Sequence, residues 1–221
     1  MIKIEHTEVY GFEAAIRGMR NPMNSWEKSD SEFYFKDSDC GADNCPMIVP
    51  NIGKNDHDLM MRLAKGGSVH AKYRRMITVT CDITAPLYWW KEFDTYKVGT
   101  VANSCSTMHK IHAKEFTLGD FSTDRMTSAR ATHLMLDVID ELNENRKWFN
   151  IEKDPVIKKN YFNNMIQLLP TSYNQKRTVQ MNYEVLVGMY RDRKNHKLDE
   201  WHVLCDWIRE LPYSEIITGE V

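Results

Sequence analysis

Two stretches of the chain carry the clearest periodic patterns of apolar and polar residues. In residues 77–83, isoleucine, valine and cysteine alternate with threonine and aspartate, and this period of two predicts a β-strand. Residues 128–148 carry apolar side chains at helical spacing, which predicts a long helix. Between them, Pro86 suits the first turn of a helix, so a helix over residues 86–96 is expected, and its aromatic content indicates burial.

Weaker patterns predict the remaining elements. The expected segments are a short strand and a helical turn within residues 2–20 and helices over residues 56–65, 158–169, 178–196 and 199–211. Asp56 fits the N-cap of the first of these helices. Residues 21–55 are polar and turn-rich, so they are expected to form a long irregular loop of the kind that often carries function. We therefore predict an α+β protein, with a small antiparallel or mixed sheet and several packed helices in a single domain over residues 1–221.

The composition excludes several classes of protein. Of the 221 residues, 42% are hydrophobic and 27% charged, which is globular and excludes a wholly disordered chain. With 29 basic and 31 acidic residues the net charge is −2, so neither a nucleic acid nor a membrane is expected as a partner. No apolar run approaches the roughly 20 residues of a membrane span. The N-terminus has no apolar signal core, so a cytoplasmic protein is expected.

The five cysteines do not form a recognisable framework. Their number is odd and they are scattered along the chain, which indicates free thiols in a reducing compartment. Cys40 and Cys45 form a pair near His57, but a zinc site needs four ligands and no second pair follows at a suitable spacing. The surrounding residues are typical of turns, so we predict a loop here and no metal site.

Two polar segments are candidates for binding an anion. Residues 103–107 (Asn-Ser-Cys-Ser-Thr) follow Gly99, and small hydroxyl residues beside a glycine can offer N–H and O–H donors to a phosphate. An ordinary polar loop is the alternative, and Cys105 or Ser106 as a nucleophile is a further one. The second segment is the basic stretch 191–197, which either binds an anion or only complements the dipole of a helix C-terminus. The residues alone do not select a reaction.

The order of several motifs along the chain indicates a particular reaction. Leu169 and Pro170 are followed 12 positions on by Asn182 and then by Arg193, and the strand that ends at Ala85–Pro86 runs into an aromatic helix. These residues, with their spacing, resemble the flavin-dependent thymidylate synthases, the ThyX family. The resemblance covers roughly residues 70–107 and 163–211. It implies the ThyX fold and a divergent, phage-like member, acting in the cytoplasm of a bacterium or of a phage-infected host.

The resemblance also shows where the chain departs from the family. Counting on from Ala85–Pro86, the family's Arg-His-Arg-x-x-Ser signature falls on Thr95, Tyr96, Lys97 and, for the serine, Thr100. One positive charge and one hydroxyl therefore remain. Glu92 stands where many members carry glutamine, and its carboxylate can accept a hydrogen bond from uracil N3–H but cannot donate one.

What the resemblance implies is a reductive methylation of dUMP to dTMP. In the family FAD, reduced by NADPH, supplies hydride and methylenetetrahydrofolate supplies the carbon, in homotetramers whose sites are shared between subunits. Arg193 would be catalytic, polarising a pyrimidine carbonyl. The implied substrate-binding residues are Glu92, Ser104, Cys105, Ser106, Lys110 and Arg193. The implied cofactor-binding residues are His70, Tyr96, Lys97, Thr100, Asn103 and Asn182.

Two other functions are compatible with these motifs. The first is a related enzyme with altered one-carbon chemistry, for example one that hydroxymethylates a pyrimidine deoxynucleotide. The second is a non-catalytic nucleotide-binding protein on the same fold, which the altered signature at Thr95 and Tyr96 would favour, because function depends on the site and not on the fold.

Overall fold

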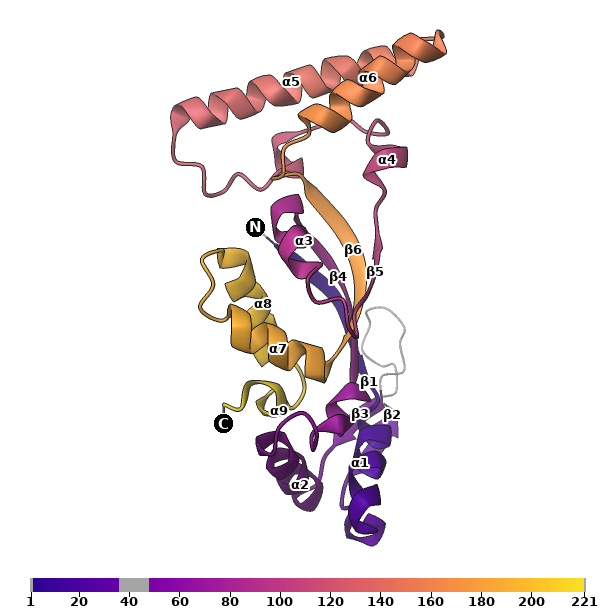
Figure 1. The fold of residues 1–221 in the computed structure, drawn as a ribbon, viewed down its shortest axis with the longest axis vertical. Helices are drawn as coiled ribbons and strands as arrows, with labels where there is room; N and C mark the ends of the chain where they lie inside the picture. The colour runs from indigo at the N-terminus through magenta and orange to yellow at the C-terminus, as the bar shows by residue number, and fades with distance from the viewer. Residues whose placement is uncertain (1, 36–47, 221) are drawn as a thin grey trace. The chain divides into compact units, whose positions relative to one another are not determined.

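The computed structural model describes residues 2–35 and 48–220, which form two compact units. Unit 1 comprises residues 1–5, 82–95 and 102–178, and unit 2 comprises residues 6–81, 96–101 and 179–221. The strands are β1 (Lys3–Tyr10), β2 (Glu32–Phe35), β3 (Ile48–Asn51), β4 (Thr78–Pro86), β5 (Val101–Ser104) and β6 (Asn174–Asn182). The helices are α1 (Phe12–Arg20), α2 (Lys54–Lys65), α3 (Leu87–Phe93), α4 (Thr107–Lys110), α5 (Ala129–Ile151), α6 (Pro155–Leu168), α7 (Tyr183–Arg193), α8 (Asp199–Arg209) and α9 (Glu215–Thr218) (Figure 1).

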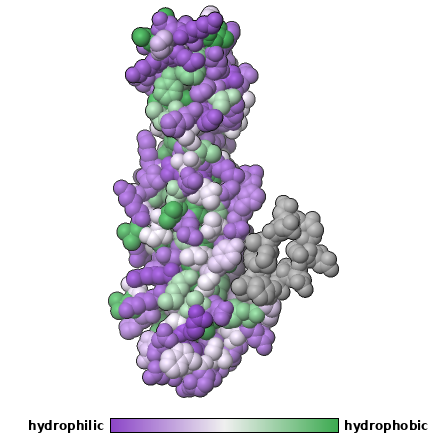
Figure 2. Space-filling model, turned by 90° about the vertical axis from the view of Figure 1, so that its right-hand side faces the viewer, coloured by the Kyte–Doolittle hydropathy of each residue, from purple (hydrophilic) through white to green (hydrophobic). Residues whose placement is uncertain are grey.

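Four strands form the main sheet, in the order β1-β4-β6-β5, and β2 pairs antiparallel with β3. The predicted α+β class is thereby confirmed, and β4 closely follows the predicted strand. On the face shown in Figure 2, hydrophilic residues predominate and hydrophobic ones lie scattered among them. Over residues 2–35 and 48–220, no helix is long and apolar enough to cross a membrane.

In unit 1, aromatic side chains fix α3 to β6. Trp89, Trp90 and Phe93 are each at most 1% exposed, as the aromatic run predicts. The indole Nε1 of Trp90 donates to the carbonyl of Gln175 at 2.9 Å, and the guanidinium of Arg177 lies 4.1 Å from the centroid of the Trp90 ring. A separate apolar core beneath α5 and α6 contains Phe116, Phe121, Met135, Ile139, Leu142 and Met165. Burial of these side chains is the main favourable term that holds the unit together.

In unit 2, a buried ion pair joins the end of α1 to the start of α2. The Nε of Arg20 donates to Asp56 at 2.6 Å, and both side chains are almost completely buried. Burial alone would raise the pKa of the Asp56 carboxyl, but hydrogen bonds from Ser31, Ser29 and Arg20 lower it overall. Asp56 is therefore not the predicted cap: Gly53 occupies the N-cap of α2, and the Asp56 carboxylate satisfies buried donors instead.

The structure corrects four further predictions. The helix predicted over residues 178–196 does not begin at residue 178, because residues 174–182 form strand β6, in which Gln175, Val179 and Met181 are buried with a period of two. The segment 21–55 is not irregular throughout, since it contributes β2 and β3. The aromatic helix is shorter than predicted and ends at Phe93, and α9 follows the helix that was expected to be last.

Candidate functional site

In unit 1, residues around the end of β5 line a cavity of about 310 Å³. Three of the predicted substrate-binding residues, Cys105, Ser106 and Lys110, lie on its wall. The other lining residues come from β4, α4, the 111–120 segment and the stretch from Tyr173 into β6, and they are Thr84, Thr107, Ile111, Lys114, Gly119, Asp120, Tyr173, Asn174, Gln175 and Lys176. Ser104 and Asn103 precede them on β5 and are exposed, without lining the cavity.

Hydrogen bonds to β6 and α4 fix the cavity's central loop. The N–H of Cys105 donates to the carbonyl of Lys176 at 2.9 Å, and Nε2 of Gln175 donates to the Cys105 carbonyl at 2.8 Å. The Oγ of Ser106 accepts from the N–H of His109 at 3.1 Å, so Ser106 is the N-cap of α4. Both backbone polar groups of Cys105 therefore form hydrogen bonds with residues of β6. Ser106, as the N-cap, orients the helical turn that carries Lys110.

The cavity wall is predominantly cationic. Lys110, Lys114 and Lys176 face a single lining carboxylate, Asp120. Lys114 donates to Asp120, which raises the pKa of the ammonium group, and Lys176 donates to Asp82 at 2.9 Å with the same effect on its pKa. Lys114 and Lys176 are each paired with a carboxylate, so Lys110 leaves this wall with a net charge of about +1, which favours an anionic ligand such as a phosphate.

In unit 2, Arg193 lies between two aromatic side chains. Its Nε donates to the hydroxyl of Tyr96 at 2.9 Å, and its guanidinium carbon lies 4.5 Å from the centroid of the Trp201 ring and 5.5 Å from that of Tyr96. Trp201 is completely buried. A guanidinium restrained by two rings keeps a fixed plane, which suits directed hydrogen bonding to a flat acceptor. The structure thus brings two of the predicted residues, Tyr96 and Arg193, together.

Elsewhere in unit 2, Gly99, Thr100 and Asn182 form a second group of predicted residues, called the Thr100 corner below. Gly99 has φ +80°, and a Cβ there would come 3.0 Å from Nδ2 of Asn182 and from Val185. Asn182 caps α7, since its Oδ1 accepts from the N–H of Val185 at 3.0 Å. The buried hydroxyl of Thr100 has no hydrogen-bond partner among residues 2–35 and 48–220. A buried hydroxyl without a partner beside an amide is a place where an external polar group can bind.

The remaining predicted residues belong neither to the unit 1 cavity nor to the contacts around Arg193 and Thr100. His70 and Lys97 are exposed in unit 2, and Glu92 is half-buried on α3 in unit 1. Cys40 and Cys45 lie outside the described residues, and no group of three or more potential metal ligands occurs in the described ranges. Sequence reasoning missed Lys176, because it reaches the cavity from β6, far from Lys110 in the chain, and it missed Lys114, which follows Lys110 by four residues but belongs to none of the motifs.

The whole chain matches solved structures of flavin-dependent thymidylate synthases. ThyX from Helicobacter pylori complexed with FAD and dUMP aligns over 99% of this chain and 98% of its own, at a TM-score of 0.65 and 14% identity. A second structure of that enzyme with FAD and dUMP aligns over 100% of this chain and 98% of its own, at a TM-score of 0.66 and 15% identity. The UMP/dUMP methylase PolB from Streptomyces cacaoi, bound with 5-Br dUMP, aligns over 99% of this chain and 95% of its own, at a TM-score of 0.58 and 11% identity.

No protein-family profile and no curated protein sequence matches the chain. The likeness is therefore structural, and at 11–15% identity it establishes the fold. The resemblance deduced from the motifs is confirmed at this level: the chain has the fold of the flavin-dependent thymidylate synthases and of the related methylase PolB.

Proposed function

We propose that this protein methylates dUMP to dTMP, using FAD, NADPH and methylenetetrahydrofolate. The observation that carries the proposal is the position of the predicted nucleotide loop. In a chain that shares its fold, end to end, with enzymes crystallised with FAD and dUMP, this loop lines a cavity with three lysines. The motifs that gave the resemblance and the cationic cavity are independent of each other, because two of the three lysines are not part of any motif.

The nucleotide phosphate is assigned to the unit 1 cavity. Lys110 is exposed on the last turn of α4, while Lys114 and Lys176 are each held by a carboxylate. Lys110 would make the direct contact with the phosphate, and the two paired lysines would contribute to the positive potential of the wall. Ser104 and Ser106 border the same loop, where hydroxyl groups can add hydrogen bonds.

Arg193 is assigned to the pyrimidine ring. A guanidinium that donates to a ring carbonyl stabilises the negative charge that develops on the ring when C5 attacks an electrophile. Tyr96 and Trp201 would act as positioning residues, because they fix the plane of the guanidinium. Glu92 would accept the N3–H of uracil, which distinguishes uracil from cytosine, since cytosine N3 carries no proton.

The residues at the Thr100 corner fit a flavin. The buried hydroxyl of Thr100 without a partner and the Nδ2 amide of Asn182 can both donate to a ring carbonyl, and Gly99 leaves the backbone accessible. His70, Tyr96, Lys97 and Asn103 would complete the cofactor contacts. When bound, FAD would supply the hydride that reduces the transferred one-carbon group to a methyl.

We also propose a homotetramer, in which residues of different copies form each site. Such sharing is what the ThyX resemblance implies. It accounts for the division of the predicted residues, since Lys110 belongs to unit 1 and Arg193 to unit 2.

The likeness to PolB favours a second candidate, a related methylase with a different pyrimidine nucleotide preference. The altered signature at Thr95, Tyr96 and Lys97 favours a third, a nucleotide-binding protein without catalysis. The two differ in outcome, because the methylase converts UMP or dUMP whereas the binding protein leaves both unchanged.

Complementation of a thymidine-requiring bacterium tests the leading proposal. Growth without thymidine supports a thymidylate synthase, and Lys110→Gln should slow it while Lys159→Gln, on the exposed side of α6, should not. The purified protein should also bind FAD and turn yellow. A colourless protein without FAD uptake and without complementation would refute the flavin-dependent reaction, and tight dUMP binding in that protein would support the non-catalytic alternative.

A further inference from the structure

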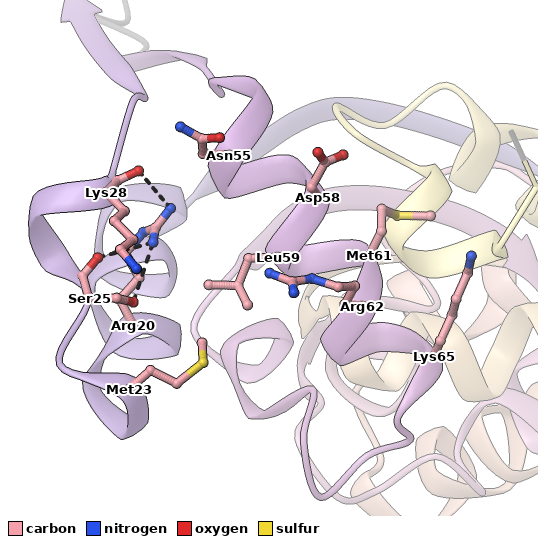
Figure 3. A pocket seen from close by; sticks show the side chains of 10 residues that line it. All are labelled: Arg20, Met23, Ser25, Lys28, Asn55, Asp58, Leu59, Met61, Arg62 and Lys65. Carbon is pink, nitrogen blue, oxygen red and sulfur yellow. Dashed lines mark hydrogen bonds between the residues drawn. The ribbon is translucent and has the colours of Figure 1, made fainter.

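A second cavity, of about 870 Å³, contains none of the residues assigned above. It lies entirely within unit 2, between α2 and the segment that follows α1 (Figure 3). On one side are Met23, Ser25 and Lys28, and on the other are residues of α2. Neither the motifs nor the ThyX resemblance predicts a site there.

The walls of this cavity are held in place from within. Arg20 is 3% exposed, and besides its ion pair with Asp56 it donates through Nη1 to the Ser25 carbonyl and through Nη2 to the Lys28 carbonyl, both at 3.0 Å. One side chain therefore ties the 25–28 segment to α2. A cavity whose walls are already fixed needs little ordering when a ligand binds.

Three cationic side chains line the cavity and one acidic side chain opposes them. Lys28, Arg62 and Lys65 are exposed, and no ion pair within the described part of the chain uses their side chains. Asp58 contributes the single negative charge, because the Arg20–Asp56 pair is neutral as a whole. Figure 3 shows Arg62 extending from α2 towards the segment that carries Met23. The lining therefore has a net charge of about +2, enough to attract a dianion.

Apolar side chains supply the other part of the lining. Met23 is 53% exposed and Leu59 is 3% exposed, and Met61 of α2 is a further apolar lining residue. Methionine is flexible and polarisable, so it packs well against flat aromatic rings. The cavity thus combines a polar, cationic part with an apolar part that can hold a base.

We propose that this cavity binds a nucleoside diphosphate. Arg62 and Lys65 would hold the phosphates, Lys28 would approach them from the opposite wall, and Met23 would contact the base. Arg62 can grip a phosphate bidentately, whereas a lysine acts as a point charge. The binding does not depend on the proposed methylation and would be separate from the dUMP cavity of unit 1.

Calorimetric titration of the full-length protein with ADP tests the proposal, with FAD present at saturation so that any flavin site is filled. The double variant Arg62→Gln/Lys65→Gln should weaken ADP binding at least about tenfold, because each lost charge-assisted hydrogen bond has an effect of this order. The matched double variant Lys153→Gln/Lys159→Gln, which removes two exposed charges elsewhere, should leave the affinity unchanged. Lys110→Gln should also leave it unchanged.

Pyrophosphate separates the two halves of the cavity. It should bind more weakly than ADP, and Met23→Ser should weaken ADP binding several-fold without changing pyrophosphate binding. No ADP binding, or ADP binding that is insensitive to the Arg62→Gln/Lys65→Gln change, would overturn the proposal. Loss of ADP binding in Lys110→Gln would overturn it too, since the nucleotide would then occupy the unit 1 cavity.

Discussion

The lysine cavity of unit 1 and the Arg193 cluster of unit 2 hold positive charge in two different ways. In unit 1, three lysines from two stretches of the chain share a cavity, and two of them, Lys114 and Lys176, are paired with carboxylates. In unit 2, one guanidinium is restrained by a hydrogen bond and two aromatic rings. The first arrangement supplies potential and tolerates adjustment. The second supplies direction and depends on geometry, so the two should respond differently to substitution.

The largest effect is expected for Arg193→Ala. If Arg193 stabilises charge on the pyrimidine, kcat should fall about 100-fold or more, the range seen when one such donor is removed. Arg191→Ala removes an exposed arginine on the same helix, paired with Asp192, and should leave kcat nearly unchanged. Turnover of dUMP with reduced FAD measures both. Equal turnover in Arg193→Ala and wild type would remove Arg193 from the site and end the contrast between the two regions.

Next in size is a change in stability at the Thr100 corner. Gly99→Ala places a Cβ in a left-handed conformation, which by itself costs about 1–2 kcal/mol of the free energy of unfolding, and the contacts at 3.0 Å with Asn182 and Val185 should raise the loss above that. Gly67→Ala is the control, because Gly67 also has positive φ but its Cβ would meet nothing within 4 Å. Urea unfolding of both variants measures the difference. Equal losses would mean that the conformation alone matters and that the corner has room to spare.

Lys110→Gln should weaken binding of dUMP about tenfold, since one charge-assisted contact to the phosphate is lost. The effect should appear in KM rather than in kcat, and it should shrink as ionic strength rises. Lys159→Gln provides the matched control. If kcat fell and KM did not, Lys110 would be acting on the reacting ring, as Arg193 is expected to.

The smallest effect concerns the Lys114–Asp120 pair. Burial would raise the pKa of the Asp120 carboxyl, but hydrogen bonds from Lys114 and Thr117 bring it below its ordinary value of 3.8. A lowered folded-state pKa adds stability at neutral pH, which is lost as the pH falls through and below that value. Asp120→Asn should therefore reduce stability by roughly 0.2–1 kcal/mol at pH 7, the range of exposed pairs, and by less near pH 3. A difference that stays constant from pH 7 to pH 3 would contradict this account.

The sequence predicted most of the helices and the strand β4, because their periodicities reflect burial directly. The pattern wrongly predicts helix over Thr178–Met181 of β6, because the alternation of buried Val179 and Met181 is short and the helical pattern that follows obscures it. It also predicted Asp56 as a helix cap, whereas Asp56 is the third residue of α2 and forms an ion pair with the buried Arg20, 36 residues earlier. No local pattern encodes such a pair.

The candidate site shows the same limit. The motif residues Cys105, Ser106 and Lys110 could be picked from the sequence because they are neighbours, and the structure places them on one cavity wall. Lys176 could not, since only the pairing of β5 with β6 brings it to Cys105, and Lys114, although four residues from Lys110, belongs to no motif that would single it out. Trp201 was predicted only as part of a helix, and its contact with Arg193 depends on how α8 packs on α7.

Asn182 both ends strand β6 and caps helix α7. Because this double role fixes where α7 begins, the number of residues in α7 determines where Arg193 lies. Arg193 is the eleventh and last residue of this helix, counted from the cap. Inserting or deleting one residue there would turn Arg193 by about 100° around the helix axis and move it about 1.5 Å along it, away from Trp201. This displacement explains why the ThyX resemblance needs no gap between Leu169 and Arg193. Homologues should vary in the composition of α7 far more freely than in its count of residues.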